Sequence, residues 1–132
     1  MTYREAINLG EKVLNMADVA DAKIDAWLLL EMVCKIDRSF YYLHMEDEVA
    51  EEQLSEYEIA LRKRAEHVPL QYIVGEAEFM GLKFKVNSNV LIPRQDTETL
   101  VEEVLKVVKP GMKVLDMCTG SGCVLISILK NV

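Results

Sequence analysis

The chain has 132 residues, of which 51% are hydrophobic and 28% are charged, and this globular composition excludes a disordered or fibrous protein. The formal net charge of -7 argues against a general nucleic-acid-binding protein, because such proteins carry a basic face or stripe. The three cysteines lack disulfide-framework spacing, no apolar run approaches the roughly 20 residues of a membrane span, and no secretory leader is visible, so we expect a cytoplasmic protein.

Amphipathic helices are predicted for the first half of the chain. Apolar residues recur at three-to-four spacing over residues 3–16, 22–36 and 48–67. Residues 37–39 between the second and third helices read as a loop, in which Ser39 could cap a short turn. Pro69 is expected to end the third helix, because the residue before a proline avoids the helical region. We therefore predict an α-helical bundle over residues 1–68.

Several side chains of this bundle have an expected environment. Those expected to face the core are Leu54, Tyr57, Leu61 and Ala65 in the third helix, together with Cys34 and the aromatic residues Trp27, Phe40, Tyr41 and Tyr42. The acidic residues 46–48 are expected to form a solvated helix start, favoured there by the helix dipole. The alternative is that they contact a basic surface of a partner.

The periodicity changes after the bundle. Residues 71–79 and 82–86 look extended, because apolar and polar residues alternate in the second stretch. Met80-Gly81 between them reads as a hairpin turn. We therefore expect a β-hairpin linker over residues 69–92.

The remainder of the chain predicts a helix, then a strand, a tight loop and a second helix. These elements are expected at residues 97–108, 113–116, 117–122 and 123–129. Asp96 or Thr97 can cap the first helix. A strand followed by a glycine-containing loop and a helix is the first crossing of an open α/β sheet, where ligands bind at the carboxyl ends of the strands. We therefore expect residues 93–132 to be the incomplete start of a Rossmann-like α/β domain.

The glycine-containing loop is the strongest candidate for a ligand site. Gly120 and Gly122 lack a Cβ atom, so the backbone can approach a ligand, and the free amides of the following helix suit an anionic group. The Gly-x-Gly-x-x-Gly fingerprint is absent, with Cys118 at its first glycine, and no Gly-Lys-Ser/Thr follows, which excludes a P-loop. The Asp-x-x-Thr-Gly-Ser-Gly pattern fits an S-adenosylmethionine loop better. Asp116 could then accept hydrogen bonds from loop amides or a ligand amine, and a structural turn without a ligand is the alternative.

A metal site is not expected. Cys118 and Cys123 flank the loop, but no pair of cysteines or histidines has the spacing of zinc ligands.

The segments upstream of the loop make the pattern more specific. They are Pro69-Leu70-Gln71-Tyr72-Ile73, Glu78-Phe79-Met80-Gly81-Leu82 and Val90-Leu91-Ile92-Pro93-Arg94-Gln95-Asp96-Thr97-Glu98. In this order, and followed by Leu115-Asp116-x-x-Thr119-Gly120-Ser121-Gly122, they resemble the release factor glutamine methyltransferases. The resemblance is strong over residues 69–129 and mainly architectural before them.

The resemblance implies a function for the full-length protein. It implies transfer of a methyl group from S-adenosyl-L-methionine to the glutamine side-chain amide in the Gly-Gly-Gln motif of a peptide chain release factor. It also implies a monomeric cytoplasmic enzyme in which residues 1–68 recognise the substrate and residues 93–132 begin the methyltransferase domain. The family's catalytic Asn-Pro-Pro-Tyr motif is not among the 132 residues, so no catalytic residue is assigned and the chain is expected to be inactive by itself.

Site residues follow from the same resemblance. The cofactor-binding set is Asp116, Cys118, Thr119, Gly120, Ser121 and Gly122, with Cys118 replacing the usual glycine. Arg94 and Glu98 are expected near the cofactor pocket, although a plain helix N-terminal turn explains Glu98 as well. Neither nucleic acid nor a membrane is expected as a direct partner. Two other functions stay open: a standalone helical module that binds a translation factor without catalysis, and methylation of a ribosomal protein glutamine, as in a sister group.

Overall fold

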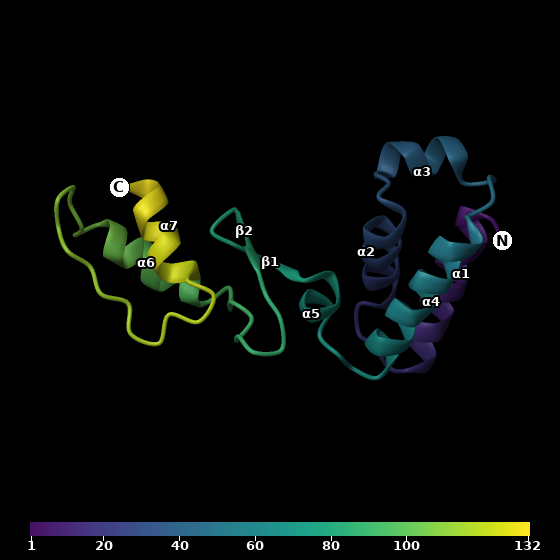
Figure 1. Cartoon of the computed structure of the whole chain (residues 1–132), viewed down its shortest axis with the longest axis horizontal. Coiled ribbons are helices and arrows are strands. Elements are labelled where there is room, and N and C mark those ends of the chain that lie inside the picture. The colour runs from purple at the N-terminus through teal and green to yellow at the C-terminus, as the bar shows by residue number, and fades with distance from the viewer. The chain divides into compact units, whose positions relative to one another are not determined.

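The computed structural model describes all 132 residues, which divide into two compact units, Met1–Val74 and Gly75–Val132 (Figure 1). The first unit contains α1 (Tyr3–Met16), α2 (Ala22–Cys34), α3 (Arg38–His44), α4 (Glu51–Ala65) and α5 (Leu70–Val74). The second contains β1 (Glu76–Phe79), β2 (Leu82–Lys85), α6 (Thr97–Leu105) and α7 (Cys123–Asn131). No helix combines the length and the apolar character that crossing a membrane requires.

The first unit begins with a capping box that fixes the start of α1. The Thr2 hydroxyl accepts from the Glu5 amide at 3.2 Å, and the Glu5 carboxylate accepts from the Thr2 amide at 2.8 Å. The second of these bonds lowers the pKa of the Glu5 carboxyl group, because it favours the charged form. The predicted bounds of this helix, residues 3–16, are confirmed.

The core of the first unit lies where α1, α2 and α4 pack against one another. Its fully buried side chains include Ala6, Leu14, Ala26, Leu29, Leu30 and Tyr57. The Tyr57 hydroxyl donates to the backbone carbonyl of Ala26 at 3.1 Å, and burial raises the pKa of this phenol. Gly10 of α1 makes room for the phenol, since a Cβ atom there would lie 2.1 Å from the Tyr57 oxygen. The prediction that Tyr57 faces the core is confirmed.

A buried ion pair joins α2 to the end of α4. The Arg64 Nε atom lies 2.7 Å from Asp25 Oδ2, and only 5% of Asp25 is exposed. The same guanidinium group donates from Nη1 to the Val68 carbonyl at 3.2 Å. The pair therefore ties the segment after α4 to the bundle.

The end of α4 differs from the sequence prediction in position and in cause. The helix ends at Ala65, and His67 adopts a left-handed φ of 64°. The Val68 amide then donates to the Lys63 carbonyl, and the His67 amide donates to the Arg64 carbonyl. This pairing is a Schellman motif, so the helix ends before Pro69 can act on it.

Four further expectations for local structure are wrong. Residues 70–74 form α5 rather than a strand, because the Pro69 carbonyl accepts from the Tyr72 and Ile73 amides and a proline's fixed φ suits a first helical turn. The Asp37 carboxylate, not Ser39, caps α3 by accepting from the Phe40 amide at 2.7 Å. The helix expected from residue 48 begins at Glu51. Asp96 precedes α6, but its side chain makes no capping hydrogen bond.

The aromatic residues of the first unit divide between core and surface. Trp27 is buried, as predicted, but no residue of α3 is buried, and Tyr42 is 62% exposed. The short α3 follows Lys35, whose backbone is in the left-handed conformation, and it does not take part in the packing of α1, α2 and α4 against one another. The prediction that Phe40 and Tyr42 belong to the core is therefore wrong.

The second unit begins with the predicted β-hairpin. Phe79 pairs with Leu82, which leaves Met80 and Gly81 as a two-residue turn with φ values of 50° and 72°. Positive φ at both positions defines a type I′ turn, whose twist matches that of the flanking strands. The buried Phe79 and Phe84 rings pack edge to face with each other, and together with Val101 of α6 and Ile128 of α7 they form a small core.

The strand predicted for residues 113–116 does not form. The only sheet is the antiparallel pair of β1 and β2, and Leu115 is 82% exposed. A strand exists through its hydrogen bonds to a neighbour, and this segment has no neighbouring strand to pair with. The segment leads directly into the candidate loop.

Candidate functional site

The candidate loop spans residues 117–122 and ends at α7. Its turn is closed by a hydrogen bond from the Gly122 amide to the Thr119 carbonyl at 2.9 Å. The Thr119 hydroxyl donates to Asp116 Oδ2 at 2.8 Å. Asp116 is expected from the sequence to accept from loop amides or from a ligand amine, and in the structure it accepts from a loop hydroxyl. This bond fixes the entrance of the loop.

Three residues of the loop adopt the left-handed backbone conformation. They are Cys118, Gly120 and Gly122, with φ values of 59°, 57° and 81°. Glycine adopts this conformation freely, whereas a residue with a Cβ atom is strained there by roughly 1–2 kcal/mol. Cys118 thus occupies a conformation that glycine would adopt without strain.

The loop leaves space and an unsatisfied polar atom for a ligand. A Cβ atom built at Gly120 meets no other atom within 4 Å. The Ser121 hydroxyl oxygen is buried and has no hydrogen-bond partner. Gly122 stands at the N-cap of α7 without a capping side chain, so the first amides of that helix lack a side-chain acceptor. These features suit an anionic group such as a carboxylate, which accepts hydrogen bonds from free amides at a helix N-terminus.

Replacing Cys118 by glycine is expected to stabilise the loop by about 0.5–1 kcal/mol, because the strain of the Cβ atom exceeds the backbone entropy that glycine loses. The measurement is hydrogen exchange of the α7 amides, which should become slower. Cys118→Ala is the matched control, since alanine keeps the Cβ atom and should give no gain. Equal gains in both variants would assign the effect to the thiol and contradict the backbone explanation.

The two remaining predicted residues lie around α6. Glu98 Oε1 accepts from the Met80 amide at 2.9 Å, so this carboxylate holds the hairpin turn against the start of α6. Arg94 is exposed, and its carbonyl accepts from the Thr97 amide in the turn before the helix. The structure therefore gives Glu98 a structural contact and places Arg94 at the surface.

Sequence reasoning missed a second feature, a cleft of the helical unit lined by Trp27, Arg38 and Tyr41 among others. The signal was present in the run Arg38-Ser39-Phe40-Tyr41-Tyr42, in which three consecutive aromatic residues cannot all face inward from one short helix.

Comparison with known proteins covers both units of the chain. Residues 5–75 match the PrmC N-terminal domain family. A protein of Clostridium acetobutylicum is 44% identical over 132 residues, which are 98% of this chain and 46% of that protein. Proteins of Clostridium botulinum and Koribacter versatilis are 39% and 36% identical, over 97% and 99% of this chain and 46% and 48% of their own lengths. All three are named release factor glutamine methyltransferase, and the chain spans slightly less than half the length of each.

Proposed function

The chain belongs to the PrmC N-terminal domain family, and from this membership we propose that it is part of an S-adenosylmethionine-dependent methyltransferase acting on a glutamine side-chain amide of a peptide chain release factor. One observation carries most of the support. The three relatives with that name match 97% to 99% of the chain, so the similarity extends beyond the helical unit through the glycine-containing loop. The glutamine of the Gly-Gly-Gln motif is the proposed methyl acceptor.

In this proposal the loop holds the amino-acid end of the cofactor. Gly120 and Gly122 let the backbone approach the ligand, and the Ser121 hydroxyl gains the partner that it lacks. One oxygen of Asp116 is engaged by Thr119, and the other can accept from the ligand's ammonium group. Bound S-adenosylmethionine supplies a methyl group that is activated by its attachment to a sulfonium sulfur. The contribution of the loop is to bind and orient the cofactor.

The helical unit is proposed to recognise the release factor. Its three long helices bury their own core, which supports a separate role for residues 1–74. A loop that binds a cofactor has no need of this core. Two units with separate cores suit an enzyme whose substrate is another protein, because one unit can hold the protein while the other holds the cofactor.

The 132 residues by themselves are expected to bind S-adenosylmethionine weakly. The loop offers contacts to one end of the cofactor, whereas an acidic residue for the ribose is expected about 20 residues after the loop in this kind of fold. Isothermal titration calorimetry measures the affinity. Micromolar affinity of the 132-residue chain would show that the loop alone makes a sufficient site.

The reaction itself is tested with the full-length protein that carries this chain. We expect label from methyl-labelled S-adenosylmethionine to appear on the Gly-Gly-Gln glutamine of the release factor. Gly122→Val should abolish the transfer, because a branched side chain is strained at a φ of 81°, and a Cβ atom there lies 3.1 Å from Ile126 Cδ1. Lys83→Ala, an exposed change on β2, is the control. Label on a ribosomal protein would assign the other substrate, and binding without label would favour the non-catalytic module.

A further inference from the structure

A cleft of about 390 Å³ lies in the helical unit between α1, α2 and α3, and we call it the α1–α3 cleft. Contacts between aromatic side chains hold one side of this cleft in place. The Trp27 and Tyr41 rings meet edge to face at 5.4 Å, and the Arg38 guanidinium group lies 4.2 Å from the Trp27 ring centroid. Such a cation–π contact holds the guanidinium group in place while its edge stays free to donate hydrogen bonds.

The cleft also has an apolar rim that the fold leaves uncovered. Ile24 is 56% exposed and Tyr42 is 62% exposed, and both line the cleft. Met45 lines it as well, from the segment that follows α3. Tryptophan, tyrosine, methionine and arginine are the residues enriched where proteins bind one another. The lining therefore has the composition that is typical of a protein interface.

The charge of the cleft is opposite to that of the unit that contains it. Residues 1–74 hold fifteen Asp and Glu against eight Lys and Arg, a net charge of -7, whereas residues 75–132 hold seven of each. Yet the cleft is lined by Arg4, Lys23 and Arg38, with Glu11 as its one acidic residue. Arg4 pairs with Glu46, while Lys23 and Arg38 have no ion-pair partner. Two unpaired cations beside an apolar rim are complementary to carboxylates next to an apolar side chain.

We propose that the α1–α3 cleft docks an acidic, partly apolar segment of the release factor. This inference rests on the proposed function for the identity of the partner, and on the cleft for the chemistry of the segment. RNA is the poorer occupant, because nucleic-acid binding relies on a basic face or stripe that contacts many phosphate groups, whereas this cleft offers two unpaired cations.

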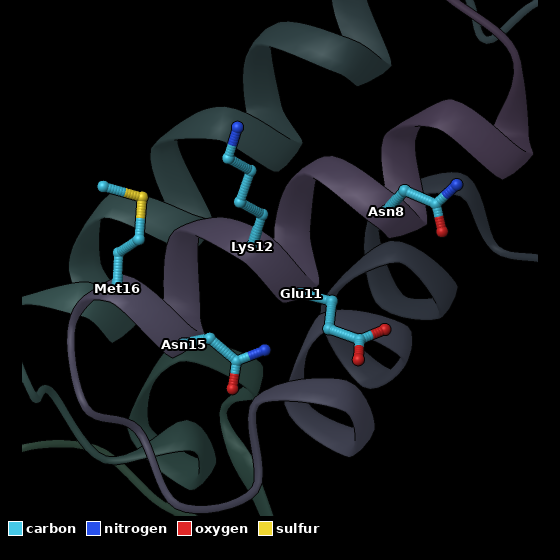
Figure 2. A pocket seen from close by; sticks show the side chains of 5 residues that line it. All are labelled: Asn8, Glu11, Lys12, Asn15 and Met16. Carbon is cyan, nitrogen blue, oxygen red and sulfur yellow. The ribbon is translucent and has the colours of Figure 1, made fainter.

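The neighbouring face of α1 does not share these properties. Figure 2 shows a second hollow, lined by the side chains of Asn8, Glu11, Lys12, Asn15 and Met16 along this helix. Asn8 and Glu11 also line the α1–α3 cleft, so the two surfaces adjoin. The second hollow has no aromatic residue, and its one cation is matched by one carboxylate. The charge and aromatic arguments therefore select the α1–α3 cleft.

The test reverses the two unpaired charges in the 132-residue chain. The substitutions are Lys23→Glu and Arg38→Glu. Both residues lie in the first turn of a helix, where the helix dipole stabilises a carboxylate, so the double variant should stay folded. The control is the double reversal Arg62→Glu and Lys63→Glu on the exposed face of α4, with circular dichroism confirming both folds. The probes are the release factor, a labelled synthetic peptide of glutamate and leucine, the same peptide with lysine for glutamate, and a single-stranded RNA.

We expect the cleft variant to bind the release factor and the acidic peptide about tenfold or more weakly than the parent chain, and the control to lose about twofold or less. The lysine peptide should not bind. If the cleft variant binds the release factor as tightly as the parent chain, the cleft is not the docking site, and the proposed function stays intact. If the parent binds the acidic peptide but not the release factor, the chemistry of the cleft stands and the proposed partner fails. The proposal would be overturned if the parent chain bound neither the release factor nor the acidic peptide, or if it bound the RNA instead. It would also be overturned if the parent chain self-associated and the cleft variant did not.

Discussion

Replacing Arg64 by alanine is expected to destabilise the helical unit by about 3 kcal/mol or more, because it leaves the buried carboxylate of Asp25 without its charge partner. The Asp25 side chain is only 8% exposed, so its carboxylate depends on the guanidinium group more than on water for its stabilisation. The Val68 carbonyl loses its donor in the same variant, which also loosens the segment after α4. Urea unfolding followed by the fluorescence of Trp27, in the core of this unit, measures the loss.

Two controls separate the buried charge from other causes. Arg4→Ala removes an ion pair of similar kind with Glu46, but both side chains are exposed there, so the cost should stay below about 1 kcal/mol. The double variant Asp25→Leu with Arg64→Met removes both charges and fills their volume, and it should recover most of the stability that Arg64→Ala loses. A double variant as unstable as Arg64→Ala would show that packing, and not the unpaired charge, causes the loss.

Replacing Gly10 by alanine is expected to destabilise the same unit by about 2 kcal/mol, although alanine is the better helix former by about 1 kcal/mol. The new Cβ atom would lie 2.1 Å from the Tyr57 oxygen and 3.1 Å from the Ala26 Cβ atom, so the phenol must move. Its hydrogen bond to the Ala26 carbonyl is then lost as well. A loss of stability would identify the clash with Tyr57 as the dominant effect, because helix propensity alone predicts that alanine stabilises the helix.

Urea unfolding of Gly10→Ala, Tyr57→Phe and the double variant gives the coupling between the two sites. Tyr57→Phe alone should cost about 1 kcal/mol through the lost hydrogen bond. In the Tyr57→Phe background, Gly10→Ala should destabilise the unit less than it does in the parent chain, because the Tyr57 hydroxyl oxygen that lies closest to the new Cβ atom is absent. Asn8→Ala, an exposed change in α1, should be nearly neutral. Additive effects in the cycle would contradict the direct contact between Gly10 and Tyr57.

The sequence by itself determined the elements whose causes lie within a few neighbouring residues. The helical period and the Thr2 and Glu5 capping box set the bounds of α1, because both act inside one or two helical turns. The Met80-Gly81 turn followed from a glycine between two short extended runs. The burial of Tyr57 followed from its place in the apolar repeat of α4. The candidate loop was located by its Asp-x-x-Thr-Gly-Ser-Gly pattern, and its role as a cofactor site stays a prediction.

Only the tertiary structure decided the contacts between residues that are distant in the chain. Asp25 and Arg64 are 39 positions apart, and only the packing of α2 against α4 brings them together. Glu98 reads in the sequence as a helix start, but 18 positions separate it from the Met80 amide that it holds. Residues 113–116 have a strand-like composition and still form no strand, because a strand is completed by a neighbour and not by its own residues. The same reason applies to the α1–α3 cleft, whose charges come from three helices and meet only when those helices pack.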